Sequence, residues 1–190
     1  NEGMSPDDST TGLTRLDGLI YEPLASKDTD GDGFTDELNP GVDPNIAISD
    51  PSLRLDDFPL DPAASMDTDG DGIPDIWNEG MDVTKSPTGL TYLDAFPLDP
   101  AASKDSDVDG FPDEWNEGMS ALDSVTNLTQ LDDLPFDPAA SLDTDGDGVP
   151  DEWNEGMSAV DSNTGLTYLD AFPFDPIFSK DSDGDGYPDE

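Results

Sequence analysis

Apolar residues are sparse along this chain and stand in short phrases among Asp, Ser, Thr, Pro and Gly. The fullest phrase, TGLTYLDAFPLDPAASKD at Thr88–Asp105, sets single Leu, Tyr and Phe residues between acids and prolines. No long amphipathic helix is predicted, and no apolar run approaches the length of a membrane span. The Ser- and Thr-rich stretches between the phrases are predicted as loops or short extended pieces.

Short helices are the only helical structure that the pattern predicts. Each would begin at a proline, carry acids in its first turn and end at a glycine. Such a segment has room for one to two turns. The starts are Pro74, Pro112 and Pro150, and the ends are Gly80, Gly118 and Gly156.

The phrases recur with a nearly constant period. DTDGDG or a close variant begins at Asp28, Asp67, Asp105, Asp143 and Asp181, so the steps are 39, 38, 38 and 38 residues. We therefore predict one tandem array of five repeats, with bounds 1–38, 39–77, 78–115, 116–153 and 154–190. Each repeat holds about seven large apolar residues, too few for an independent core, so it needs metal or its neighbours.

Charge limits the partners of the chain. There are 47 acidic and 6 basic residues, a net charge of −41, and no Cys or His. Such self-repulsion opposes compaction unless cations offset it, and nucleic acid and anionic membranes are not expected partners. The composition also excludes disulfides, Cys/His zinc sites and catalysis by a His base or a Cys nucleophile.

The acidic phrase has the ligand spacing of an EF-hand loop. Alternate side chains of a tightly curled loop point inward at one ion, and Gly at position 6 permits the turn. Positions 1, 3, 5 and 9 are Asp in all five copies: Asp28, Asp30, Asp32, Asp36; Asp67, Asp69, Asp71, Asp75; Asp105, Asp107, Asp109, Asp113; Asp143, Asp145, Asp147, Asp151; and Asp181, Asp183, Asp185, Asp189. A carbonyl at position 7 is expected from Phe34, Ile73, Phe111, Val149 and Tyr187. Position 12, a Glu in the EF-hand, is Asn39, Asn78, Asn116 and Asn154, which are included as candidate ligands. Hard oxygen ligands of this kind favour Ca²⁺.

A second set of carboxylates precedes the loops at fixed distance. They are candidates to bridge to the far side of the loop, giving one to two Ca²⁺ per repeat; equally, they fit as turn residues before proline. The set is Asp17, Glu22, Asp56, Asp61, Asp94, Asp99, Asp132, Asp137, Asp170 and Asp175.

The phrases DTDGDGIPDIWN, DTDGDGVPDEWN and DAFPLDPAASKDSDVDG resemble thrombospondin type 3-like repeats of the cysteine-free bacterial surface-protein type. The resemblance covers essentially the whole chain. It implies extracellular calcium binding and an elongated, solenoid-like rod with little regular secondary structure. Animal members carry disulfides; this chain has no Cys, so its order would rest on calcium and aromatic packing.

Tryptophan stands at loop position 11 as Trp77, Trp115 and Trp153. We favour a small core in which each Trp packs on a Phe-Pro unit, because Leu38 replaces Trp in the first repeat. The alternative is an exposed Trp row that stacks on sugars.

The sequence thus predicts an extracellular, secreted or cell-surface, calcium-binding stalk, spacer or fibril. The alternative is an adhesin or carbohydrate-binding segment. We expect no enzyme, because the same carboxylates recur five times without a distinct pocket-forming segment. Copies joined end to end through Asn1–Met4 and attached glycans, with Asn127-Leu128-Thr129 as the N-glycosylation sequon, are further expectations.

Overall fold

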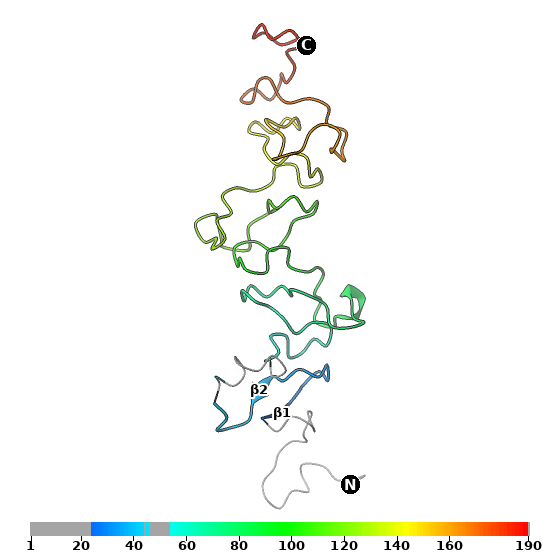
Figure 1. The fold of residues 1–190 in the computed structure, drawn as a ribbon, viewed down its shortest axis with the longest axis vertical. Coiled ribbons are helices and arrows are strands. Elements are labelled where there is room, and N and C mark those ends of the chain that lie inside the picture. The colour runs from blue at the N-terminus through cyan, green and yellow to red at the C-terminus, as the bar shows by residue number, and fades with distance from the viewer. Residues whose placement is uncertain (1–23, 44, 46–53, 190) are drawn as a thin grey trace, which may run out of the picture. The chain divides into compact units, whose positions relative to one another are not determined.

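Irregular loops dominate the fold. The computed structural model describes residues 24–43, 45 and 54–189. Strands β1 (Ala25–Lys27) and β2 (Glu37–Leu38) pair antiparallel (Figure 1). A short 3₁₀ helix, η3 (Val83–Lys85), is capped by Asp82, whose side chain accepts a hydrogen bond from the Thr84 N–H at 2.9 Å. The expectation of little regular secondary structure is confirmed for the described residues.

Backbone pairing across each acidic loop supplies most of the order. The Asp113 N–H donates to the Lys104 carbonyl at 2.9 Å, and the Asn116 N–H donates to the Ala101 carbonyl at 2.9 Å. These bonds tie the two ends of the loop together. The same pairs occur from Asp36 to Lys27 and Asn39 to Leu24, from Asp75 to Met66 and Asn78 to Ala63, and from Asp151 to Leu142 and Asn154 to Ala139.

The short helices predicted after Pro74, Pro112 and Pro150 are not present. Each segment instead forms a turn, such as the one closed by the Met119 N–H and the Asn116 carbonyl at 2.9 Å. A helix from Pro112 would need the Asn116 N–H to donate to the Pro112 carbonyl, but this N–H donates to Ala101 and the Pro112 carbonyl accepts from Asp132. The predicted terminal glycines do adopt a left-handed conformation, with φ of 74° at Gly80 and 82° at Gly118.

Small side chains form the buried interior. Among the described residues, the fully buried apolar side chains belong to the Ala pairs of the PAAS phrases, to the single Ala of the PLAS phrase and to prolines: Ala63, Ala64, Ala101, Ala102, Ala139, Ala140, Ala25, Pro74, Pro112 and Pro150. Backbone bonds such as Asn116 to Ala101 bring two chain segments together here. A larger side chain would hold those segments apart, so alanine suits this position.

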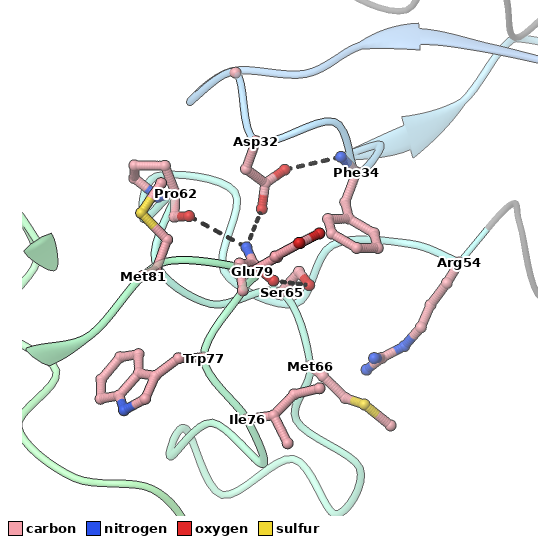
Figure 2. A pocket seen from close by; sticks show the side chains of 12 residues that line it. Asp32, Phe34, Arg54, Pro62, Ser65, Met66, Ile76, Trp77, Glu79 and Met81 are labelled. Carbon is pink, nitrogen blue, oxygen red and sulfur yellow. Dashed lines mark hydrogen bonds between the residues drawn. The ribbon is translucent and has the colours of Figure 1, made fainter.

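The tryptophans are half-buried rather than central. Trp77 lines a cavity of about 560 Å³ together with Phe34 and Met81 (Figure 2), and Trp153 lines one of about 600 Å³ with Phe111. In both cavities the neighbouring aromatic residue comes from position 7 of an acidic loop. The packing of Trp on a Phe-Pro unit stays a prediction, while the fully buried apolar side chains of the described residues are alanines and prolines.

The chain divides into two compact units. The first lies within Asn1–Thr68 and Gly72–Leu93, and the second within Asp69–Asp71 and Asp94–Glu190. Within the described residues, no helix is long and apolar enough to cross a membrane. The predicted end contact at Asn1–Met4 falls outside the described residues, as do Asp17 and Glu22.

Candidate metal centre

Each acidic loop is curled around the carboxylate at its first position. In the loop that begins at Asp105, the two carboxylate oxygens accept hydrogen bonds from the N–H groups of Val108 at 2.7 Å and Gly110 at 3.0 Å. Asp28, Asp143 and Asp181 accept from the corresponding N–H groups at positions 4 and 6. These bonds hold positions 3 and 5 on the same side of the curl as position 1.

The carboxylates at positions 1, 3 and 5 converge. In the loops that lie within one unit, each of the three Asp residues offers one oxygen, and these oxygens lie within 4.8 Å of one another. The groups are Asp28, Asp30, Asp32; Asp105, Asp107, Asp109; Asp143, Asp145, Asp147; and Asp181, Asp183, Asp185. The sequence prediction for positions 1, 3 and 5 therefore matches the geometry of a cluster able to hold a cation.

The loop that begins at Asp67 contains the division between the two units. In the first unit the Gly72 N–H donates to Asp67 at 2.8 Å. In the second unit the Asp71 N–H donates to Asp69 at 3.1 Å. These are the bonds that the other loops make at the same positions.

Position 9 is held by the residue at position 2. Asp113 accepts from the Ser106 N–H at 2.9 Å and from its hydroxyl at 2.6 Å, and the Lys104 ammonium lies 3.2 Å away. These contacts lower the pKa of Asp113, against the opposing effect of its burial, and they lower that of Asp36 in the same way. Asp75, Asp151 and Asp189 have the same hydroxyl partner at position 2. Position 9 thus helps to close the loop, and in Asp151 the second oxygen is buried and has no hydrogen-bond partner within the described residues.

Positions 7 and 12 have partners that the ligand prediction did not include. The Phe111 N–H donates to Asp109 at 2.8 Å, which fixes the position-7 backbone beside the cluster. The same bond is made by Phe34, Val149 and Tyr187. At position 12, the Asn116 side-chain oxygen accepts from the Ser103 hydroxyl at 2.8 Å, and its amide nitrogen donates to Asp71, in the loop before its own, at 2.7 Å. Asn39, Asn78 and Asn154 accept from Ser26, Ser65 and Ser141 in the same manner.

At three of the loops, one residue of the second carboxylate set reaches the cluster from the following repeat. The Asp132 N–H donates to the carbonyl of Pro112 at 2.9 Å, beside the Asp113 end of the loop. The Asp132 side chain is 5% exposed; one oxygen accepts from the Leu134 N–H at 2.7 Å, and the other is buried and has no hydrogen-bond partner within the described residues. Asp56 and Asp170 repeat this arrangement at the loops that begin at Asp28 and Asp143.

These buried carboxylates carry a high electrostatic cost. Burial and then the negative charges of Asp109, Asp107 and Asp113 raise the pKa of Asp132 to about 7. Burial and the charges of the first loop likewise raise the pKa of Asp56 to about 7, and the pKa of Asp170 is raised for the same reasons. A bound cation would offset this cost.

The other member of each pair is a structural acceptor. Asp99 is fully buried and accepts from the hydroxyls of Ser124, at 2.5 Å, and Thr126, and from the Thr126 N–H at 3.1 Å. These hydrogen bonds lower the pKa of Asp99 to about 2 despite its burial. Asp61 and Asp137 have equivalent hydroxyl partners.

Asp94 and Asp175 are the remaining members of the second carboxylate set within the described residues. Asp94 is buried, and its side chain accepts from the Phe96 N–H at 2.7 Å. Asp175 is exposed and accepts from the Ile177 N–H at 3.3 Å. Asp175 therefore stands apart from Asp61, Asp99 and Asp137, the buried residues of its class.

The Ser and Thr partners of these carboxylates were not among the predicted site residues. A signal was present in the sequence, because the hydroxyl residues before each LT phrase keep the repeat period; the Ser of PAAS keeps it too, but that Ser donates to the position-12 Asn and not to a carboxylate. Their role depends on which carboxylate they meet, and that requires the path of the chain between repeats.

The cluster has the chemistry of a site for a hard cation. Three converging carboxylates, a fourth buried carboxylate and adjacent backbone carbonyls are all oxygen donors, and the chain has no His or Cys. No family model, curated protein or solved structure matches this chain.

Proposed function

We propose that this chain is an extracellular calcium-binding structural protein, in which cations hold successive acidic loops in one repeat array. The observation that carries the proposal is the buried, unpartnered oxygen of Asp132, set beside the three converging carboxylates of Asp105, Asp107 and Asp109. An unpaired buried carboxylate facing like charges is strongly unfavourable unless a cation compensates it. Asp56 and Asp170 provide the same argument at two other loops.

Calcium is the cation that this donor set favours. The loop and Asp132 together supply four carboxylates, and the position-7 carbonyl and water would complete the roughly six to eight oxygens that Ca²⁺ takes. Mg²⁺ demands a stricter octahedron and gives up its water reluctantly, so it should bind more weakly to a curled loop of this kind. We propose one ion at each loop, with a second ion per repeat as the upper limit.

Calcium binding would couple to folding. One cation in each of five loops would offset ten of the 41 net negative charges. Little apolar surface larger than alanine is fully buried, so the free energy of binding would contribute directly to the order of the fold. The proposed role is mechanical: a calcium-stiffened rod of thrombospondin type 3-like repeats that acts as a stalk, spacer or fibril.

Isothermal titration of the calcium-free chain tests this proposal. We expect at least one Ca²⁺ per intact loop, with affinities of roughly 10⁻⁴ to 10⁻³ M typical of extracellular modules, and weaker binding of Mg²⁺. The Asp107→Asn variant should remove the ion of one loop, whereas the exposed Asp123→Asn is a matched control. Absence of calcium binding by the unaltered chain would refute the proposal.

Glycan binding is a second candidate function. It is favoured by the half-buried Trp153, which lines an open cavity together with Phe111, Gln130 and Glu152, a mixture of aromatic and polar groups that suits a sugar. On this hypothesis Trp153→Ala should abolish retention on a glycan array and leave stability in calcium unchanged. Equal retention of the two proteins, or loss of stability in the variant, would count against it.

A further inference from the structure

The asparagine at loop position 12 uses both ends of its side-chain amide. In Asn154 the oxygen accepts from the Ser141 hydroxyl at 2.9 Å, and the nitrogen donates to the Pro138 carbonyl at 3.2 Å and to Asp109 Oδ2 at 2.7 Å. Both groups that receive the N–H bonds are acceptors only, so a flipped amide would place its oxygen against two other oxygens. Asn154 is therefore fixed as a donor toward a loop that lies 45 residues earlier in the sequence.

The first unit contains the same arrangement. Asn78 accepts from the Ser65 hydroxyl at 2.9 Å and donates to the Pro62 carbonyl at 3.2 Å and to Asp32 Oδ2 at 2.7 Å. Figure 2 shows Asp32 and Pro62 with these hydrogen bonds. The contact thus occurs independently in the two units.

The amide fixes one carboxylate of the preceding cluster. Asp109 Oδ1 accepts from the Phe111 N–H at 2.8 Å, and Asp109 Oδ2 accepts from Asn154. One hydrogen bond on each oxygen determines how the carboxylate is turned, while lone pairs remain for a cation. Without Asn154, Asp109 would keep its local bond and lose the bond that restrains its other oxygen.

We propose that Asn154 and Asn78 are positioning residues for the cation of the preceding loop rather than ligands of their own loops. This inference rests on the proposed calcium-binding function. Each amide presents a carboxylate that would bind the ion, and it makes the affinity of one loop depend on the folding of the next repeat. Calcium binding in one loop and folding of the next repeat would therefore favour each other by the same coupling free energy.

Site-resolved calcium titration of the full chain by ¹⁵N NMR tests the inference. The Gly110 amide reports on the loop that begins at Asp105, and the Gly148 amide reports on the loop that begins at Asp143. In Asn154→Ala we expect the affinity at Gly110 to fall roughly 10- to 100-fold, as for other residues that orient metal ligands, and the affinity at Gly148 to stay within about twofold. Asn163→Ala is the matched control, because the Asn163 side chain is exposed and the hydrogen bond from Asn163 to Asp137 uses the backbone N–H.

The outcomes separate the inference from the proposed function. A loss confined to Gly148 would show that Asn154 is a ligand of its own loop and would overturn the inference, as would unchanged affinity at both glycines. Absence of any calcium response in the unaltered chain would refute the proposed function itself. A uniform loss at all loops would indicate a purely structural role and would also overturn the inference.

A second variant guards against misfolding. Asn78→Ala should weaken the response of Gly33, in the loop that begins at Asp28, and leave that of Gly72 unchanged. If Asn154→Ala fails to fold in saturating calcium, this first-unit variant decides the question by the same criteria.

Discussion

Replacing the buried carboxylate of Asp132 by an amide should change stability with opposite sign in the presence and absence of calcium. Asp132→Asn keeps the shape of the side chain and removes its charge. Without cations, the ionised and buried Asp132 is repelled by the charges of Asp109, Asp107 and Asp113, so the neutral variant should be more stable. With calcium, the variant loses one ligand charge, so the calcium-bound fold should be less stable.

The size of the effect without calcium follows from the pKa. A pKa of Asp132 raised from 3.8 to about 7 corresponds at most to about 4 kcal/mol of destabilisation by the ionised group above pH 7. Counter-ions reduce this, so we expect a gain of about 1–3 kcal/mol in the free energy of unfolding at pH 8 in chelator. In saturating calcium we expect a loss of about 1–3 kcal/mol, equivalent to roughly a 10- to 100-fold weaker site.

Urea unfolding of both proteins, followed by tryptophan fluorescence in chelator and in calcium, measures the two effects. The neighbouring Asp133→Asn is the control; Asp133 is exposed and accepts from the Asp143 N–H at 3.1 Å, a bond that the amide oxygen retains. If Asp132→Asn shifts stability in the same direction under both conditions, the carboxylate is not the unpaired group that we describe.

Three further predictions address other contacts. Lowering the pH from 8 to 5 should weaken calcium binding, because protons compete with calcium for Asp56 and Asp132, whose pKa is raised to about 7. For the same reason the calcium-free fold should gain stability below pH 7 and lose it as the pH rises through 7. Urea unfolding in chelator measures this second effect. Val108→Gly should stabilise the chain by about 0.5–1 kcal/mol in thermal unfolding, because Val108 has a φ of 67° where other loops have Gly. The control Asn127→Gly, at a φ of 71°, should change stability less, because Asn tolerates this conformation. Destabilisation by Val108→Gly would refute the claim that Val108 is strained. The double variant Ser124→Ala/Thr126→Ala should lose about 2–3 kcal/mol of unfolding free energy at pH 7, because Asp99 is left buried with two fewer donors. The difference from the unaltered chain should shrink as the pH falls below 3.8 toward the lowered pKa of about 2. Equal stability of the two proteins at pH 7 would contradict this prediction.

The local part of the site could be predicted from the sequence. Positions 1, 3 and 5 of a loop lie two residues apart, and Gly at position 6 permits the curl, so the convergence of Asp105, Asp107 and Asp109 follows from spacing alone. The scarcity of helices and strands also followed from the short apolar phrases.

The contacts between repeats could not be predicted. Whether Asp132 meets the loop before it or after it depends on the path of the 18 residues between Asp113 and Asp132, and the spacing is compatible with both. Asn154 has the right position for a ligand of its own loop, yet its amide donates to Asp109. The alanine interior was missed because size normally favours Trp and Phe as core residues, whereas here two hydrogen-bonded segments approach too closely for either.

The central claim, that calcium orders this acidic chain, is tested most directly by the hydrodynamic radius and near-ultraviolet circular dichroism of the same sample before and after chelation. We expect calcium to give fixed tryptophan signals and excess chelator to abolish them with a change in radius, reversibly on return of calcium. Identical radius and spectra in calcium and in excess chelator would contradict the account.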